Sequence, residues 1–251
     1  MTDLPEPNRA PGIETLARDY PRGGGVAPHA HDAGQLVFAR RGVMRVLAQG
    51  GTWVVPPARA LWVPPRMTHE IRCRTDVAMR TVYLADTPVA PARRHCAVID
   101  VSPLLREVIL RLVEGPADEA ARPYLVWLLL HEIEAGQLEP LNLPEPHDPR
   151  LARVAAALAD DPADGRTLDD WAGVAGMAGR SFARRFTAET GLTFGAWRRR
   201  ARLLAAIERL AGGEAVTVVA LEAGYDSVSA FIHAFRRELG VTPGRYFAGE
   251  G

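Results

Sequence analysis

The last third of the chain contains the same local pattern twice. Each copy has two alanines three apart, a glycine directly after the second alanine and, further on, two phenylalanines four apart. These residues are Ala172, Ala175, Gly176, Phe182 and Phe186, then Ala220, Ala223, Gly224, Phe231 and Phe235. A short helix, a glycine-containing tight turn and a second helix with apolar residues at helical spacing form the helix-turn-helix pattern. Two such units in tandem predict a domain that binds double-stranded DNA.

The second helix of the first copy is predicted over residues 179–190. Its two phenylalanines mark a buried stripe, so the other faces present Arg180, Ala183, Arg184 and Thr187. Arginine can donate two hydrogen bonds to guanine O6 and N7. We therefore expect Arg180 and Arg184 to read bases, and Arg185 to contact phosphate.

The corresponding helix of the second copy begins at Asp226-Ser227 and has a less polar exposed face. The side chains there are Val228, Ser229, Ile232 and His233, followed by Arg236 and Arg237. Such a face is suited to thymine-methyl contacts and a few hydrogen bonds. We expect Arg236 and Arg237 to anchor phosphates.

A long helix is predicted from Phe194 to about Ala211, between the two copies. A rigid spacer of this kind would let one chain read adjacent major grooves, which lie roughly 34 Å apart on one face of the duplex. The formal net charge is zero, which argues against nonspecific coating of nucleic acid. Residues 180–202, however, contain seven arginines and a single acid, Glu189. This local excess of positive charge also favours DNA as the partner.

At 251 residues the chain is long enough for two domains, and its 47% hydrophobic and 24% charged residues are ordinary for a globular protein. Cys73 and Cys96 form neither a metal-ligand spacing nor a disulfide framework. The N-terminus lacks a signal-peptide pattern, and the longest apolar run, Tyr124 to Leu130, is too short to span a bilayer. The sequence thus predicts a cytoplasmic protein without a membrane partner.

Residues 1 to about 22 are expected to form a loose arm. Short β-rich runs separated by glycine and proline follow, at 35–39, 42–48, 52–55, 60–63, 68–73 and 79–84. This spacing predicts a small sandwich or barrel. Phe38, Trp53 and Trp62 would either wall a pocket in it or belong to its core.

Two motifs in this region resemble those of the cupin superfamily. They are Gly23-x5-His29-x-His31-x3-Gln35-x6-Gly42 and Pro64-x-Arg66-x-x-His69, with Arg66 where a glycine is usual. The resemblance implies that His29, His31, His69 and the residue at the Gln35 position face into the barrel, where they hold a divalent ion in metal-binding cupins. Gln35 replaces a glutamate, which would weaken a site for a hard cation. The histidines would alternatively line the mouth of an effector pocket without metal.

Helices are predicted over about 102–115 and 119–135. They would either offer a surface for self-association or simply cover the barrel. Four prolines between residues 139 and 149 then predict a semi-rigid, extended linker.

The end of the chain closely resembles the signature of AraC/XylS-type transcriptional regulators. The residues that carry the resemblance are Gly224-Tyr225-Asp226-Ser227-x-Ser229-x-Phe231-x-x-x-Phe235-Arg236-Arg237-x-x-Gly240-Val241-Thr242-Pro243-x-x-Tyr246. The family pattern implies base-facing positions at Arg180, Ala183, Arg184, Val228, Ser229 and His233. It also implies promoter binding by the tandem unit and effector control through a cupin-like N-terminal domain. Ala183 departs from the polar residue often found at its position.

The expected fold is a two-domain α+β protein with a small cupin-like β-barrel, following helices and an all-α domain of two helix-turn-helix units joined by a long helix. The expected boundaries are 1–96 for the effector-binding barrel, 97–138 for the helical pair, 139–149 for the linker and 150–251 for the DNA-binding domain.

The function expected is that of a sequence-specific transcription regulator controlled by a small molecule or a metal, not of an enzyme. It requires no cofactor, although a divalent metal in the cupin-like site is one expectation. Its partners would be promoter DNA and a small-molecule effector, with RNA polymerase and a second copy of the chain as further candidates. The alternative is a metal-dependent cupin enzyme fused to a DNA-binding module. Gln35 and the lack of a clear general base beside the histidines argue against that alternative.

Overall fold

The computed structural model of the protein describes residues 12–85, 94–115 and 118–247. The chain divides into two compact units. The first contains the described residues up to Gln49 and from Val55 to Pro140, and the second contains Gly50–Val54 and the described residues from Leu141 onward. Each unit is described by itself.

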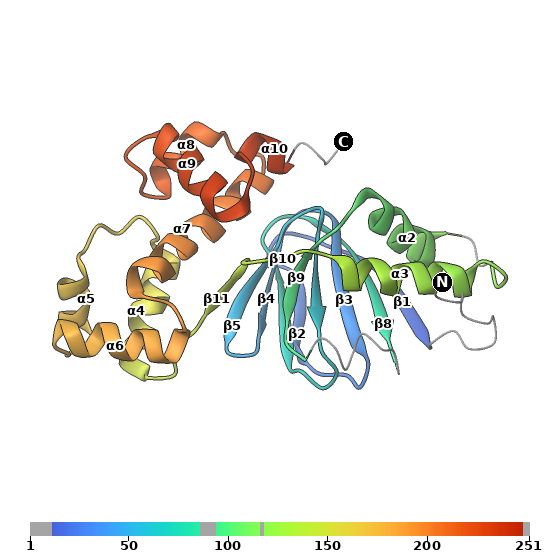
Figure 1. The fold of residues 1–251 in the computed structure, drawn as a ribbon, viewed down its shortest axis with the longest axis horizontal. Helices are drawn as coiled ribbons and strands as arrows, with labels where there is room; N and C mark the ends of the chain where they lie inside the picture. The colour runs from blue at the N-terminus through green and yellow to red at the C-terminus, as the bar shows by residue number, and fades with distance from the viewer. Residues whose placement is uncertain (1–11, 86–93, 116–117, 248–251) are drawn as a thin grey trace. The chain divides into compact units, whose positions relative to one another are not determined.

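The first unit is a β-sandwich of two antiparallel sheets (Figure 1). One sheet has the strand order β1 (Ile13–Tyr20), β8 (Val77–Leu84), β3 (Gly34–Arg41), β6 (Arg59–Val63), β9 (Ala97–Asp100) and β10 (Leu138–Glu139). In the other sheet, β7 (His69–Cys73) pairs on one side with β4 (Met44–Ala48) and on the other with β2 (Gly25–His29). The predicted small β domain is confirmed.

The expectation of a loose N-terminal arm is wrong for residues 13–20. They form β1, which pairs with β8 along its full length, from Ile13 opposite Leu84 to Tyr20 opposite Val77. The strand is mostly exposed and lacks a regular apolar alternation, so a long-range ladder rather than its own pattern holds it. Residues 1–11 of the expected arm lie outside the described residues. The predicted strands also omitted β2 and β9, although β9 extends the larger sheet by pairing with β6.

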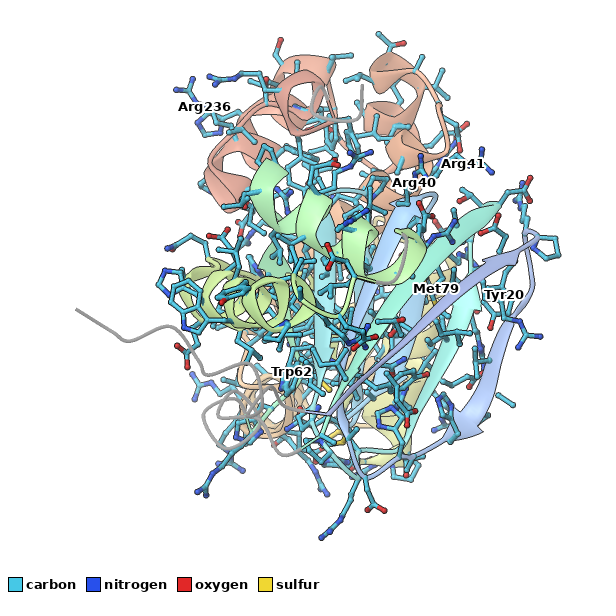
Figure 2. All side chains as sticks on the ribbon, turned by 90° about the vertical axis from the view of Figure 1, so that its right-hand side faces the viewer. Tyr20, Arg40, Arg41, Trp62, Met79 and Arg236 are labelled. Carbon is cyan, nitrogen blue, oxygen red and sulfur yellow. The ribbon has the colours of Figure 1, made fainter. Side chains whose placement is uncertain are left out.

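Two helices cover the larger sheet, namely α2 (Pro103–Glu114) and α3 (Arg122–Ala135) (Figure 1). Ser102 caps α2 by accepting a hydrogen bond from the Leu105 N–H, and Pro103 occupies the first turn, as predicted. The shared core contains Leu36, Phe38, Trp62 and Val82 from the sheet and Leu105, Ile109, Val126, Leu129 and Ile133 from the helices. The inner faces of the helices therefore cover the sheet, and Phe38 and Trp62 are core residues; Figure 2 labels Trp62 within this sheet.

The second unit is mainly helical. Its helices are α4 (Pro149–Asp160), α5 (Leu168–Val174), α6 (Gly179–Thr190), α7 (Phe194–Ala211), α8 (Val216–Glu222), α9 (Val228–Leu239) and α10 (Pro243–Phe247). Every helix predicted in this region is present, and α7 runs over the predicted residues 194–211. No helix in the described part of the chain is long and apolar enough to cross a membrane.

The proline-rich segment is more ordered than a simple linker. Its residues Asn142–Pro144 form β11, which pairs with β5 (Gly51–Val55). The indole N–H of Trp197, on α7, donates a hydrogen bond of 2.7 Å to the Pro144 carbonyl. Asp148 caps α4, and Pro149 lies in its first turn. Much of the predicted linker is thus packed onto the helical unit.

Candidate DNA-reading helices and ligand site

The first helix-turn-helix comprises α5, a tight turn and α6. Thr167 and Asp170 form a reciprocal capping box at the start of α5, because each side chain accepts a hydrogen bond from the other residue's backbone N–H. Gly176, in the turn, has a φ of 64°, a backbone conformation that glycine adopts without strain. The turn then leads into α6.

One face of α6 is buried against α7. Phe182 and Phe186 are fully buried, and both make edge-on contacts with Phe194, with ring centroids 5.0 and 5.3 Å apart respectively. The other faces carry the predicted reading residues. Arg180 and Arg184 are exposed, whereas Ala183 and Thr187 are half-buried. The Thr187 hydroxyl donates to the Ala183 carbonyl at 2.9 Å and so bonds back to its own helix.

The seven arginines between residues 180 and 202 fall into two groups. Four bind protein atoms: Arg185, Arg198, Arg200 and Arg202. Arg180, Arg184 and Arg199 make no hydrogen bond or ion pair with any residue that the structure describes. Both arginines expected to read bases therefore have guanidinium groups available for a ligand.

Arg185 differs from its neighbour Arg184. Its guanidinium lies 3.0 Å from the Asp148 carboxylate and 3.1 Å from the Glu189 carboxylate. Asp148 is almost fully buried and also binds Arg150 at 2.9 Å. The geometry therefore ties Arg185 to the start of α4.

The second helix-turn-helix comprises α8, a turn at Gly224 and α9. Gly224 has a φ of 77°, and the Ser227 side chain caps α9 by accepting from the Ala230 N–H at 3.1 Å. Phe231 and Phe235 are fully buried, as the repeat predicts.

The exposed face of α9 presents the residues expected to meet DNA. Ser229, His233, Arg236 and Arg237 are exposed, and Val228 is half-buried. Figure 2 shows Arg236 projecting from the surface of the helical unit. Arg237 forms an ion pair of 3.0 Å with its neighbour Glu238, which is a weak surface interaction.

Three histidines meet at one end of the first unit. His29 ends β2, His69 begins β7 opposite it, and His31 follows two residues after His29. The imidazole centroid of His69 lies 4.2 Å from that of His29 and 5.2 Å from that of His31. Their metal-ligating nitrogens all lie within 4.8 Å of one another. The cupin-like spacing therefore brings its three histidines together.

Backbone carbonyls orient all three imidazoles. The Nδ1 atoms of His29, His31 and His69 lie 2.9, 2.6 and 2.9 Å from carbonyl oxygens two residues away. Because a carbonyl only accepts, these contacts assign the proton to Nδ1 and leave a lone pair on each Nε2 of the neutral ring. The Nε2 atom of His69 is buried and has no hydrogen-bond partner among the described residues. An orphaned acceptor beside two other imidazoles is the kind of group that a ligand or metal satisfies.

Gln35 extends the cluster into the sandwich. The Thr81 hydroxyl donates to the Leu36 carbonyl at 3.0 Å and accepts from the Gln35 amide nitrogen at 2.9 Å. This orientation turns the amide oxygen towards His31, whose Nε2 lies 3.0 Å away. Both ring nitrogens of His31 therefore face oxygen acceptors, which a neutral imidazole with one N–H cannot satisfy together. A cation shared by Nε2 of His31 and the amide oxygen of Gln35 would satisfy both.

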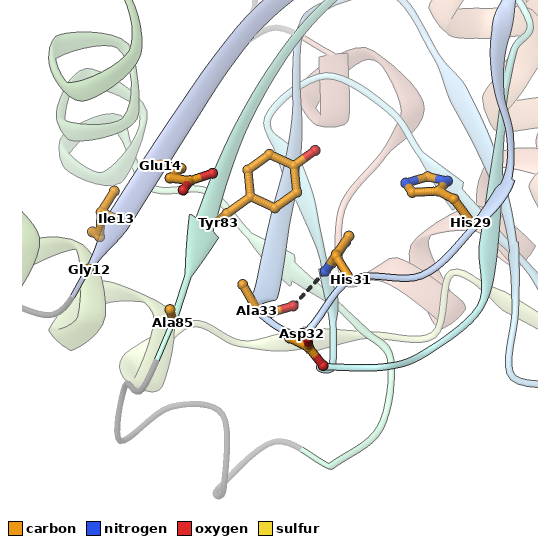
Figure 3. A pocket seen from close by; sticks show the side chains of 9 residues that line it. All are labelled: Gly12, Ile13, Glu14, His29, His31, Asp32, Ala33, Tyr83 and Ala85. Atoms are coloured by element: carbon orange, nitrogen blue, oxygen red, sulfur yellow. Dashed lines mark hydrogen bonds between the residues drawn. The ribbon is translucent and has the colours of Figure 1, made fainter.

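A cavity of about 640 Å³ opens beside the histidines. Figure 3 shows His29, His31 and Tyr83 around it, together with Glu14 on β1. The Tyr83 ring meets the His31 ring edge-on, with centroids 5.1 Å apart. The sequence pointed to neither Glu14 nor Tyr83, because Glu14 lay in the expected arm. Tyr83 pairs opposite Gln35 in a ladder whose register only the structure gives.

Burial determines the protonation behaviour of the pocket. It lowers the pKa of His69, and the neighbouring His29 and His31 lower it further, although the Met67 carbonyl opposes the shift. Burial also raises the pKa of the Tyr83 phenol. At neutral pH His69 is therefore neutral, which is the form that ligates metals.

Arg66 occupies the position where the cupin motif usually has a glycine. Its φ of 62° lies in the left-handed region, where a glycine is least strained. Its guanidinium pairs with Asp32 at 3.1 Å, but both side chains are highly exposed. The chain thus keeps the turn of the motif with a non-glycine residue.

Two family models match the chain. The AraC-like ligand binding domain matches residues 10–130, and a helix-turn-helix domain matches residues 171–249. The chain is 33% identical over 223 residues to the HTH-type transcriptional regulator NimR of Escherichia coli (strain K12), covering 88% of this chain and 81% of NimR. It is 37% identical over 103 residues to the HTH-type transcriptional regulator RipA of Corynebacterium glutamicum, covering 41% of this chain and 31% of RipA.

Similar solved structures include ToxT from Vibrio cholerae, which has a TM-score of 0.41 and 10% identity over 94% of this chain and 98% of ToxT. The DNA-binding domain of AdpA in complex with a target DNA has a TM-score of 0.38 and 34% identity, over 41% of this chain and 92% of that domain. The family models and the match to NimR agree with the two units of the fold. The chain belongs to the AraC family of DNA-binding transcription regulators, with an AraC-like ligand-binding domain followed by a helix-turn-helix domain.

Proposed function

We propose that this regulator reads a two-part operator, with α6 in one major groove and α9 in the next. The observation that carries the proposal is the division among the arginines of the first repeat. Arg180 and Arg184 are exposed on α6 and make no polar contact with described residues, while Arg185, directly after Arg184, is bound to carboxylates. Available guanidinium groups near the start of a reading helix are suited to guanine O6 and N7.

The other residues expected to meet DNA make different kinds of contact. Ala183 and Thr187 contribute shape and methyl contacts, because the Thr187 hydroxyl is bound within the helix. Val228, Ser229 and His233 meet base edges from α9. Arg236 and Arg237 contact phosphates, whereas Arg185 holds α6 to the start of α4 rather than binding phosphate, in revision of its expected role.

The sensed ligand binds in the cavity beside His29, His31 and Tyr83. A divalent metal fits the same site, because the three histidines place ligand nitrogens within 4.8 Å of one another and Nε2 of His69 is otherwise orphaned. His29, His31 and His69 would hold the ion, with the amide oxygen of Gln35 beside His31. Neutral nitrogen ligands and a neutral amide favour a borderline ion such as zinc, nickel or cobalt over a hard cation. When bound, the ion would supply a positive charge to which an anionic effector can bind.

The histidine cluster thus serves sensing rather than turnover. Support comes from the match to a transcriptional regulator along most of the chain. A second copy is expected to bind at the outer faces of α2 and α3, where Leu104 and Tyr124 are 50% and 45% exposed.

Selection of binding sites from random duplexes with the full-length protein tests the proposal. The expected result is a motif of two conserved parts with centres about one helical turn apart. Enrichment of a single short element, or of no motif, would contradict reading by both helices.

A further inference from the structure

Arg202, on α7, connects the loop before the first helix-turn-helix to the turn of the second. Its Nε donates a hydrogen bond of 2.8 Å to the Pro162 carbonyl, in the loop between α4 and α5. Its Nη1 donates one of 3.0 Å to the Gly224 carbonyl, in the turn between α8 and α9. One half-buried guanidinium therefore binds the backbone of the loop that leads into the first helix-turn-helix and the turn inside the second.

The two segments that Arg202 joins are also in close contact. A Cβ built on Gly224 would lie 2.9 Å from the Cα of Ala163 and 3.1 Å from the Arg202 guanidinium. Gly176, the equivalent residue of the first copy, has a similar positive φ, but a Cβ there would meet nothing within 4 Å. Both turns need glycine for their conformation, and only the second also needs it for packing. The extra requirement arises where the turn of the second helix-turn-helix touches the loop before the first.

Arg198 provides a comparison one helical turn earlier on α7. Its guanidinium donates to the carbonyls of Asp164 and Arg166, in the same loop that Arg202 binds. Among the described residues, Arg198 makes no hydrogen bond with the second helix-turn-helix. The loop is therefore held by two arginines, of which Arg202 also reaches Gly224.

This contact joins the loop before α5 to the turn before α9. Helix α7 packs against α6 through Phe194, and Gly224 lies four residues before the start of α9. Inserting one base pair between two operator halves moves the second groove by about 3.4 Å and rotates it by roughly 35°. A pair of reading helices fixed to one another cannot follow such a change without losing contacts.

We infer that Arg202 is a positioning residue that sets the spacing at which the two operator halves are recognised. This inference rests on the proposed function, in which α6 and α9 bind the same operator. Arg202 acts without touching a base, by holding the turn at Gly224 to the loop at Pro162.

The test measures the DNA affinity of three full-length proteins, namely the wild type, Arg202→Met and Arg198→Met. Each protein is titrated with the operator selected by the wild type. Each is also titrated with versions of that operator in which one base pair is added or removed between the halves. Methionine keeps an unbranched side chain but removes every donor. Wild type and Arg198→Met are expected to lose about tenfold or more in affinity on a spacing change, as for one mismatched base pair. Arg202→Met is expected to bind the original operator more weakly and to lose only about threefold or less on the change.

A spacing penalty in Arg202→Met equal to that of the wild type would overturn the inference, whatever its absolute affinity. If Arg202→Met does not fold, as judged by circular dichroism, Arg202→Gln is measured instead, since its shorter amide cannot reach both carbonyls. A wild type that binds a two-part operator equally well at every spacing would also overturn the inference and leave the proposed function standing. A wild type that selects no two-part operator would overturn both.

Discussion

The backbone N–H of Asp148 donates a hydrogen bond of 2.8 Å to the carboxylate of Glu189. Asp148 caps α4, and Glu189 lies in the last turn of α6, so the bond joins the beginning of the helical unit to its first reading helix. The N–H of His147 binds the same carboxylate at 2.8 Å. Glu238, the equivalent of Glu189 in the second copy, pairs with Arg237 instead. The repeat therefore conserves the residue type while the two carboxylates have different roles.

Acid is predicted to weaken this junction. Hydrogen bonds from the Arg150 side chain and backbone, and the charges of Arg150 and Arg185, hold the pKa of Asp148 well below its usual value of 3.8. A carboxyl whose folded pKa is depressed stabilises the fold above its unfolded pKa, and this stabilisation is lost as the pH falls below it. Asp148→Asn keeps a good cap but removes the charge. The melting temperature of the variant should lie below that of the wild type at neutral pH, and the difference should narrow below about pH 4.

Thermal melts followed by circular dichroism at several pH values would measure this difference. Asp118→Asn is the control, because the Asp118 side chain caps backbone N–H groups near the start of α3, outside this junction. A difference between wild type and Asp148→Asn that stays constant with pH would contradict the assigned role of the charge.

The segment before α4 is predicted to be part of the DNA-binding unit. A fragment of residues 141–251 keeps the Trp197 bond to Pro144 and the Glu189 bonds to His147 and Asp148. A fragment of residues 150–251 loses all of these hydrogen bonds and also the cap of α4. The cap alone contributes about 1 kcal/mol to the free energy of unfolding. Both fragments should be tested for folding by urea denaturation and for DNA binding by fluorescence anisotropy. Equal stability of the two would show that the segment is a linker without a structural role.

The histidine cluster is predicted to take up a single divalent transition ion per chain. Protein purified without a histidine tag and supplied with zinc should retain the ion through gel filtration, and elemental analysis should find it. His29→Ala and His69→Ala should each lose the ion, since three imidazoles form the site. His131→Ala is the matched control, because His131 stacks on Trp127 of α3 outside the cluster. Two results would contradict a metal site at the cluster: retention of the ion by His69→Ala to the same extent as by the wild type, or absence of the ion from the wild type. The cavity would then bind an effector without metal.

Arg237 is predicted to act through charge alone. Arg237→Ala should weaken binding to operator and unrelated DNA by similar factors, because phosphate contacts carry no base information. The slope of log affinity against log salt concentration should fall by about 1. Titrations at several salt concentrations provide the measurement. A loss confined to the operator would instead assign Arg237 to base recognition.

Local features of the helical unit were predictable from the sequence because the determinants are short-range. Thr167, Gly176, Ser227 and Gly224 occupy the caps and turns that their residue types favour, and the repeated phenylalanines are buried. The three histidines could be grouped for a different reason, because the resemblance to cupins implied a long-range pairing that local spacing does not give.

Features set by long-range pairing were not predictable in the same way. Strand β1 has a weak apolar pattern and forms because β8 is available beside it. Tyr83 reaches the pocket through a ladder register that no local signal specifies. The pairing of Arg185 with Asp148 joins residues 37 positions apart, so the sequence around Arg185 did not indicate it.

Base recognition by α6 is tested by comparing the DNA motifs selected by the wild type and by Arg184→Ala. Arg184 has no polar contact with described residues, so the substitution should leave the melting temperature nearly unchanged. The variant should lose preference at one or two base pairs of one operator half, at a cost of about 1–3 kcal/mol there, and keep the other half intact. A selected motif identical to that of the wild type would contradict base recognition by Arg184.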